Sequence, residues 1–305
     1  MSRTSDLSGV AAMLAATAFF VVGDSFMKLV TEDLPPLEVL FLRGIVASLV
    51  CAALVTLRGE WPTLPGVLDP RAVLRAVGET LCTLCYVVAL AHMPIADVIA
   101  ILQTTPLLVV VGAALLGERT GAARLGLALV GFVGALMVAQ PSAAGVSPVV
   151  LLAFGAALLG AGRDLAGRSV PTRIPVTVVN LATMLLMTVA AGIMSLAVEV
   201  WTPPSGGHMT YLGVAALLVT FGHTGLLLAY RLGRTASVAP FYYSFALWGV
   251  VAGLVVWGTL PNALALTGIA LIAGSGAATV LLDQKRRRQD ATADPGPVHP
   301  SFEEG

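Results

Sequence analysis

The chain has 305 residues, of which 57% are hydrophobic and 11% charged, and its mean hydropathy is +0.90. Soluble domains carry roughly 25% charged residues, so this composition excludes an ordinary water-soluble domain and predicts an integral membrane protein. The formal net charge is zero, and nothing in it indicates a nucleic-acid partner.

Long apolar runs follow one another along the whole chain. A membrane-spanning helix needs about 20 apolar residues, and breaks at proline, glycine and charged residues separate segments of that length. The predicted spans are 9–30, 36–57, 72–91, 95–116, 123–140, 148–168, 175–198, 210–230, 237–257 and 263–282. After Leu282 the chain is polar and contains proline, so we expect residues 283–305 to form a disordered cytoplasmic tail.

Basic residues are distributed unevenly between the two sides of the predicted membrane. All arginines and lysines except Lys28 and Arg43, which lie inside spans, fall on the side that holds both termini. The positive-inside rule then places both termini in the cytoplasm. Because lysine is scarce beside abundant alanine, glycine, leucine and valine, we expect a multi-pass protein of a bacterial cytoplasmic (inner) membrane. The KRRR run at 285–288 is explained as a cytoplasmic anchor rather than a nucleic-acid patch.

The two halves of the chain resemble each other weakly at an offset near 140 residues. LGLALVGFVGA (125–135) aligns with TGIALIAGSGA (267–277), and DSFMK (24–28) aligns with DLAGR (164–168). Each half has five spans, so the second half enters the membrane from the opposite side. The sequence therefore predicts an all-α integral membrane protein with ten transmembrane helices, built as two inverted five-helix repeats. Such repeats are typical of secondary transporters.

Charged side chains inside spans are candidates for function, because ionisable groups are costly in a bilayer. Asp24 and Lys28 are four residues apart near the outer end of the first span, and Asp164 and Arg168 are their counterparts near the inner end of the sixth. Either these pairs hold and release two gates, or each pair neutralises itself at a helix end. Arg43, deep in the second span, either ties helices together or binds an anionic group of the substrate.

The third span contains an acidic candidate for substrate binding. Glu79 shares one helix face with Cys82 and Tyr86. This carboxylate could bind a cationic group, carry a coupling proton, or pair structurally with Arg43 or Arg75.

Two further candidate groups lie in the fourth and eighth spans. Gln103 and Thr104 precede Pro106, which is predicted to interrupt the helix at mid-depth and expose polar backbone. They either line a site or form hydrogen bonds between helices. His223, with Tyr230 seven residues later on the same face, either serves binding or proton coupling or is a helix–helix donor.

The ninth span contains the aromatic cluster FYYSFALW (241–248). Tyr242, Phe245 and Trp248 could stack against a flat ligand, and lipid-facing packing is the alternative. Cys82-x-x-Cys85 lacks partner ligands, so we predict neither a metal site nor a cofactor. No Walker motif and no nucleophile–base arrangement is present, which argues against an ATPase or an enzyme.

The two halves of the chain resemble two EamA domains of the drug/metabolite transporter superfamily, and two stretches carry this resemblance. They are PPLEVLFLRG (35–44) and residues 90–138, which include GER (117–119) followed by Gly126 and Gly131. The resemblance covers about residues 9–282 and implies two EamA repeats, 9–140 and 148–282. The second half departs from the pattern, because GTLP (258–261) stands where the first half has GER-T, so Glu118 has no counterpart.

The resemblance implies transport of a small organic molecule. DSFMK and AGRDLAGR (161–168) are similar to a branch that includes riboflavin and S-adenosylmethionine uptake carriers. We therefore expect a secondary transporter that moves a small organic metabolite across the cytoplasmic membrane by alternating access, with riboflavin-like uptake. Export of amino acids, other metabolites or drugs is the alternative, and a channel or a non-transporting sensor is the alternative of another class. The expected partners are the substrate and the lipid bilayer; a coupling proton and a homodimer stay open.

Overall fold

The computed structural model describes residues 3–115, 122–140, 147–167, 170–171, 173–232 and 238–293, and in these residues the fold is helical. The first half comprises α1 (Arg3–Val30), α2 (Pro36–Arg58), the 3₁₀ helix η1 (Trp61–Leu68), α3 (Pro70–His92), α4 (Ile95–Leu102), α5 (Thr105–Leu115) and α6 (Ala122–Ala139). The second half comprises α7 (Pro148–Gly167), α8 (Val176–Val198), α9 (Gly206–Leu232), the 3₁₀ helix η2 (Ala239–Tyr243), α11 (Ser244–Trp257) and α12 (Ala263–Ala293).

The helices coincide with the apolar runs of the sequence. Within the described residues, eight helices are long and apolar enough to cross a membrane, α4 and α5 counting as one span. The shorter apolar helices Gly206–Gly222 and Phe241–Trp257 occupy the two remaining predicted spans. The chain is therefore a multi-pass membrane protein.

The last helix is longer than the sequence suggests. The structure continues α12 through Ala293, whereas disorder is expected from residue 283 onward. The added segment, DQKRRRQDATA (283–293), has no proline or glycine and is rich in residues that favour helices. The rest of the predicted tail, residues 294–305, lies outside the described residues.

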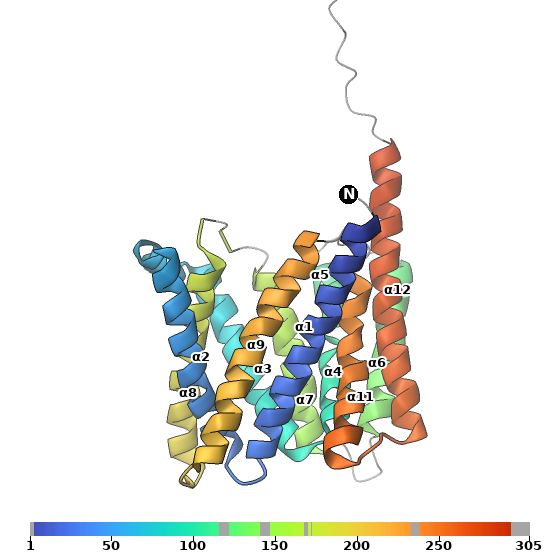
Figure 1. The fold of residues 1–305 in the computed structure, drawn as a ribbon. Helices are drawn as coiled ribbons and strands as arrows, with labels where there is room; N and C mark the ends of the chain where they lie inside the picture. Colours follow the sequence, from blue (N-terminus) through green and yellow to red (C-terminus); the bar gives the residue numbers. More distant parts are fainter. Residues whose placement is uncertain are drawn as a thin grey trace, which may run out of the picture.

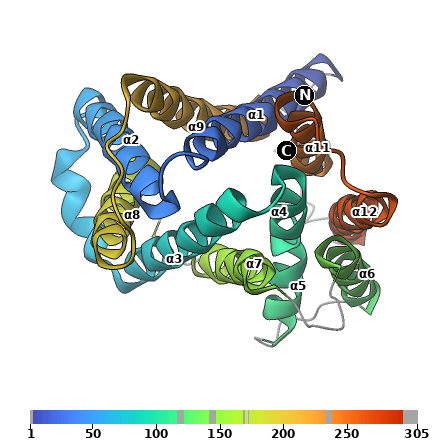
Figure 2. The ribbon, with the colours of Figure 1, turned by 90° about the horizontal axis from the view of Figure 1, so that it is seen from below.

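The helices form a ring of paired helices around a central space (Figures 1 and 2). Helix α1 packs on α9 along one side, and α3 packs on α7 along the other. The pair α2–α8 closes one end of the ring, α4 and α11 pack together towards the other, and the pair α6–α12 lies outside them. The start of α1 and the end of α12 lie at the same end of the bundle, here called the terminal end. The other end is called the opposite end.

Glycines allow α6 and α12 to pack with their backbones in contact. A Cβ atom on Gly134 would lie 2.7 Å from the carbonyl oxygen of Gly268, and a Cβ atom on Gly268 would overlap the carbonyl oxygen of Gly134. Helix association in a bilayer lacks a hydrophobic driving force between helices and relies on such close packing of small residues. This pair therefore holds residues from the two halves of the chain together.

Replacing Gly268 by alanine should destabilise the bundle. The added methyl group meets backbone, which cannot rotate away, and overpacking of this kind costs about 1–3 kcal/mol. Gly274→Ala is the matched control, because Gly274 lies on the same helix and a Cβ atom there would meet nothing within 4 Å. Thermal unfolding in detergent should show a lower apparent melting temperature for Gly268→Ala than for Gly274→Ala. Equal melting temperatures would contradict the packing account.

Candidate functional site

A cavity of about 470 Å³ lies at the centre of the ring. Both halves of the chain contribute to its wall. The charged and polar lining residues are Asp24, Arg43, Glu79, Cys82, Thr83, Tyr86, Gln103, Thr105, Arg163, Asp164 and Tyr242. The other lining residues are Phe20, Leu102, Pro106, Gly160, Val219 and Leu226. The volume lies within the range of small-molecule sites.

The innermost part of the cavity is formed by Asp24, Arg43 and Tyr86. Each lies about 10 Å from the opposite end of its helix, at 1.5 Å per residue, because α1 ends at Val30, α2 begins at Pro36 and α3 ends at His92. Towards the terminal end the wall continues through Arg163 and Asp164, which lie in the last two turns of α7. The cavity therefore extends from the terminal end to beyond mid-depth.

Asp24 is held by Tyr86 and not by Lys28. The Tyr86 hydroxyl donates to Oδ2 of Asp24 at 2.7 Å, and both residues are buried. The alternative of a self-neutralising Asp24–Lys28 pair is therefore wrong, and the gate role stays a prediction. A buried carboxylate needs hydrogen-bond donors, and α3 supplies one across the helix interface.

Lys28 lies outside the cavity, at the opposite end of the bundle. Its Nζ donates to the carbonyl oxygens of Leu90 at 2.5 Å and Met93 at 2.8 Å. Carbonyls in the last turn of a helix have no partner within the helix, so the ammonium group satisfies the end of α3. The same Nζ lies 5.7 Å from the centre of the Trp257 ring, which joins α1 to the end of α11.

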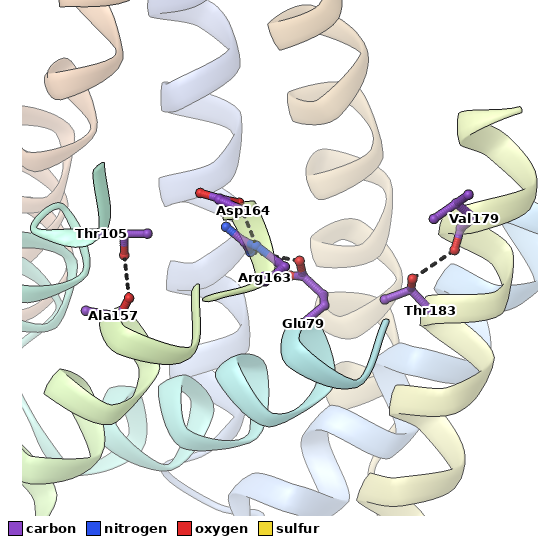
Figure 3. A network of polar contacts seen from close by, with 7 residues as sticks. All are labelled: Glu79, Thr105, Ala157, Arg163, Asp164, Val179 and Thr183. Atoms are coloured by element: carbon purple, nitrogen blue, oxygen red, sulfur yellow. Dashed lines mark hydrogen bonds and ion pairs between the residues drawn. The ribbon is translucent and has the colours of Figure 1, made fainter. Parts of the chain in front are cut away.

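Glu79 and Asp164 share one guanidinium group (Figure 3). Nη1 of Arg163 donates to Oε2 of Glu79 at 2.7 Å, and Nε donates to Oδ1 of Asp164 at 2.9 Å. Among the alternatives for Glu79, pairing with Arg43 or Arg75 is wrong, because the partner is Arg163; the binding and proton-coupling alternatives stay predictions. Gly78 permits the contact, because a Cβ atom there would lie 3.2 Å from Cβ of Arg163.

The helix break predicted before Pro106 is confirmed. Helix α4 ends at Leu102 and α5 begins at Thr105, and Gln103 between them lines the cavity. Nε2 of Gln103 donates to the carbonyl oxygen of Tyr242 at 3.3 Å. The break therefore places an amide group at mid-depth, as the sequence indicates.

The threonines beside this break have different positions. The Thr104 hydroxyl donates to the carbonyl oxygen of Ile101, and Thr104 borders a separate apolar cavity of about 310 Å³ against α6. Thr105 lines the central cavity and donates to the carbonyl oxygen of Ala157 on α7 at 3.3 Å.

Of the predicted aromatic residues in the ninth span, Tyr242 lines the cavity. Phe245 is buried behind it, parallel to the Tyr242 ring with a centroid distance of 6.4 Å, and 6.1 Å edge-on from Phe20. Phe20 lines the cavity but has no signal in the sequence beyond an apolar helix. Trp248 packs against the hydrophobic core and does not line the cavity.

Some predicted residues lie outside the described part of the structure. They are Arg168 and the side chains of His223 and Tyr230. Among the described residues, no group of three or more His, Cys, Asp and Glu side chains could hold a metal ion.

At the opposite end, carboxylates join the two halves of the chain. Glu199, directly after α8, accepts hydrogen bonds from the backbone N–H groups of Leu37 and Glu38 at 2.9 and 3.0 Å. The first N–H groups of a helix have no partner within the helix, so Glu199 caps α2 from the other half. In return, Glu38 accepts from the backbone N–H of Thr202 at 3.0 Å.

Three more contacts join the halves at the opposite end. His208 contacts Asp33 at 3.1 Å, and Nε1 of Trp257 donates to Glu32 at 2.6 Å. The side chains of Gln140 and Asn262 exchange two hydrogen bonds, at 2.9 and 3.0 Å. Together with the Glu199 and Glu38 bonds, these are called the opposite-end contacts.

We expect Glu79 and Arg163 to be energetically coupled. A double-mutant cycle with Glu79→Gln and Arg163→Gln should give a coupling free energy of unfolding of about 0.5–3 kcal/mol, because both side chains are only 23% exposed. Asp69 and Arg173 form the matched control, because their distance is 3.7 Å and Arg173 is 78% exposed. A Glu79–Arg163 coupling no larger than the control coupling would contradict a specific ion pair.

Comparison with known proteins defines the class of this helical bundle. Residues 7–140 match the model of the EamA-like transporter family. A riboflavin transporter of Rhizobium johnstonii is 31% identical over 72% of each chain, and a riboflavin transporter of Vibrio cholerae is 31% identical over 66% of this chain and 68% of its own. A pseudopaline exporter of Pseudomonas aeruginosa is 29% identical over 87% of this chain and 93% of its own.

The fold agrees with this class. One crystal structure, 22% identical, covers 94% of this chain and 99% of its own with a TM-score of 0.62. The protein is thus a multi-pass secondary transporter of a small molecule and not an enzyme. The chain belongs to the EamA-like transporter family.

Proposed function

We propose that the chain carries a small organic metabolite across a bacterial cytoplasmic membrane by alternating access, with the central cavity as the substrate site. The observation that carries this proposal is the cavity itself, which is lined by both halves and combines charged, amide and aromatic groups. A site between two halves can be opened to one side at a time when the halves rock. Glu79, Tyr86, Gln103 and Tyr242 are the predicted substrate-binding residues that line it.

The packing of the helices supports the ten-helix inverted repeat. In the alignment of 9–140 with 148–282, α1 corresponds to α7, α2 to α8, α3 to α9, α4–α5 to η2–α11, and α6 to α12. Helices α2 and α8, α4 and α11, and α6 and α12 pack on their own counterparts. The packing of α1 on α9 corresponds to that of α7 on α3, and α2 on α9 corresponds to α8 on α3. Exchanging the halves therefore preserves the main helix pairs.

The structure supports an orientation in which the cavity faces the cytoplasm. The cavity extends towards the terminal end, where the positive-inside rule places the cytoplasm. The opposite-end contacts close the other side. In this proposal Lys28 belongs to that closure, whereas Asp24 belongs to the floor of the cavity. Asp164, with Arg163 and Glu79, lines the path towards the terminal end.

Two substrate classes remain candidates within this proposal. Riboflavin-like uptake is supported by the riboflavin transporters among the relatives and by the aromatic Phe20 and Tyr242 in the wall. Export of an amino acid or another metabolite is supported by the pseudopaline exporter. A coupling proton and a homodimer stay predictions.

Purified protein in liposomes should exchange its substrate saturably. Liposomes loaded with unlabelled compound would be offered labelled riboflavin, S-adenosylmethionine or an amino acid, with and without a pH gradient. Glu79→Gln should reduce the exchange, because the residue lines the cavity, whereas Thr210→Ala should not, because Thr210 is exposed and bonds only its own helix. Non-saturable conductance would instead indicate a channel, and binding without flux would indicate a sensor.

Locking the opposite end should stop exchange. In a variant with Cys51, Cys82 and Cys85 replaced by alanine, Asp33→Cys and His208→Cys can be linked by a short bifunctional thiol reagent, since the native side chains are 3.1 Å apart. We expect the linked protein to lose exchange and to regain it when a cleavable linker is reduced.

The two single-cysteine variants, treated in the same way, are the control for this experiment. Each should exchange as fast after the treatment as before it, because it cannot form the link. Full exchange in the linked double variant would show that the opposite end does not need to open. It would contradict the proposal that these contacts open and close during transport.

A further inference from the structure

The two arginines of the cavity wall differ in what they bind. Arg163 uses Nη1 and Nε for Glu79 and Asp164. Arg43 is 8% exposed and lines the same cavity, yet within the described part of the chain its guanidinium group makes no hydrogen bond and no ion pair within 4 Å. A guanidinium group stays charged in proteins and carries five N–H donors in a fixed fork. Leaving these donors without partners at such depth is costly.

Asp24 and Arg43 line the same cavity without forming an ion pair with each other. The two groups interact electrostatically, but they are not joined by an ion pair, and the hydrogen bond from Tyr86 holds the Asp24 carboxylate at Oδ2. Asp24 is 7% exposed, so both charges lie away from bulk water. Two opposite charges thus border one cavity without an ion pair between them.

We propose that the ligand of this cavity is a small zwitterion, with its carboxylate bound by Arg43 and its cationic nitrogen bound by Asp24. The inference rests on the proposed function and names the substrate class of the same site. The guanidinium fork matches a carboxylate in a bidentate geometry. A group that carries both charges on neighbouring atoms, as an α-amino acid does, satisfies both sides of the floor together.

Charge balance selects the zwitterion over singly charged ligands. In the wall, Arg163 is already in contact with Glu79 and Asp164. The floor adds one acid and one base that form no ion pair, and the ligand that matches the floor is neutral overall. A simple anion would leave Asp24 facing added negative charge, and a simple cation would leave the donors of Arg43 unfilled. A neutral flavin has no ionised carboxylate for the Arg43 fork. The remaining wall, with Phe20 and Tyr242, is left to contact the side chain of the ligand.

The test varies the ligand before it varies the protein. Wild-type protein in liposomes would be offered L-phenylalanine, L-methionine and L-histidine, each beside its methyl ester, which lacks the carboxylate, and its deaminated acid, which lacks the ammonium group. Riboflavin is the neutral comparison. We expect saturable exchange of at least one amino acid. The concentration that gives half-maximal exchange should be at least tenfold higher for its ester and for its deaminated acid.

Variants then assign each charge to its residue. Arg43→Gln should remove the preference for the amino acid over its ester, and Arg43→Lys should keep part of that preference because the charge remains. Asp24→Asn should remove the preference for the amino acid over the deaminated acid. Ligand-induced thermal stabilisation of each purified variant, beside its monodispersity, separates lost binding from lost folding. The wild-type ligand series stays decisive if a variant does not fold.

The outcomes distinguish this inference from the proposed function. Saturable exchange of riboflavin that exceeds that of every amino acid, and that Arg43→Gln leaves unchanged, would overturn the zwitterion and keep the carrier. Equal exchange of an amino acid and its ester would also overturn it. If folded protein exchanged none of the three amino acids, the zwitterion would be overturned, whereas the carrier would be contradicted by non-saturable conductance or by binding without flux.

Discussion

The cost of placing charge inside a bilayer governs how this bundle is built. An ionised side chain removed from water must be paired, bonded to backbone, or left facing a polar cavity. All three solutions are present among the described residues. Arg163 lies between two carboxylates, Lys28 binds carbonyls at a helix end, and Arg43 with Asp24 borders the central cavity. The same constraint that shapes the fold therefore places Arg43 and Asp24, which form no ion pair with each other, at a cavity that a polar ligand can enter.

The positions of the helices were predictable because the bilayer reduces them to a one-dimensional signal. A span must be about 20 apolar residues long, and a proline in the interior of a span, such as Pro106, interrupts the helix. The partners of the charged residues were not predictable, because they lie on other helices. Spacing puts Asp24 and Lys28 on one helix face, but in the structure Asp24 accepts from Tyr86 and Lys28 donates to the end of α3. Arg163 stands next to Asp164 in the sequence, and nothing in the spacing connects it to Glu79.

The aromatic cluster shows a second limit of reading one helix at a time. A regular α-helix has 3.6 residues per turn, whereas a 3₁₀ helix has 3.0. The segment FYYSFALW crosses from η2 into α11 at Ser244, so faces assigned with a single period do not hold across it. Tyr242 consequently reaches the cavity while Trp248 packs in the core. Phe20 was missed for a simpler reason, since a phenylalanine in an apolar run has no signal that separates cavity from core.

Two kinds of contact between the halves have different physical properties. Where the opposite-end contacts lie near bulk solvent, as for Asp33 with His208, water can replace each hydrogen bond, so each bond contributes only about 0.5–1.5 kcal/mol net. The Gly134–Gly268 contact is backbone against backbone, and separating it inside the bilayer would lose close packing that water cannot restore. A transporter that alternates needs hydrogen bonds that water can replace, here called the first kind, at the end that opens. It needs close backbone packing, the second kind, where the halves stay together. Glu199 fits the first kind, because water could reach the N–H groups that it caps on α2 if the halves parted at that end.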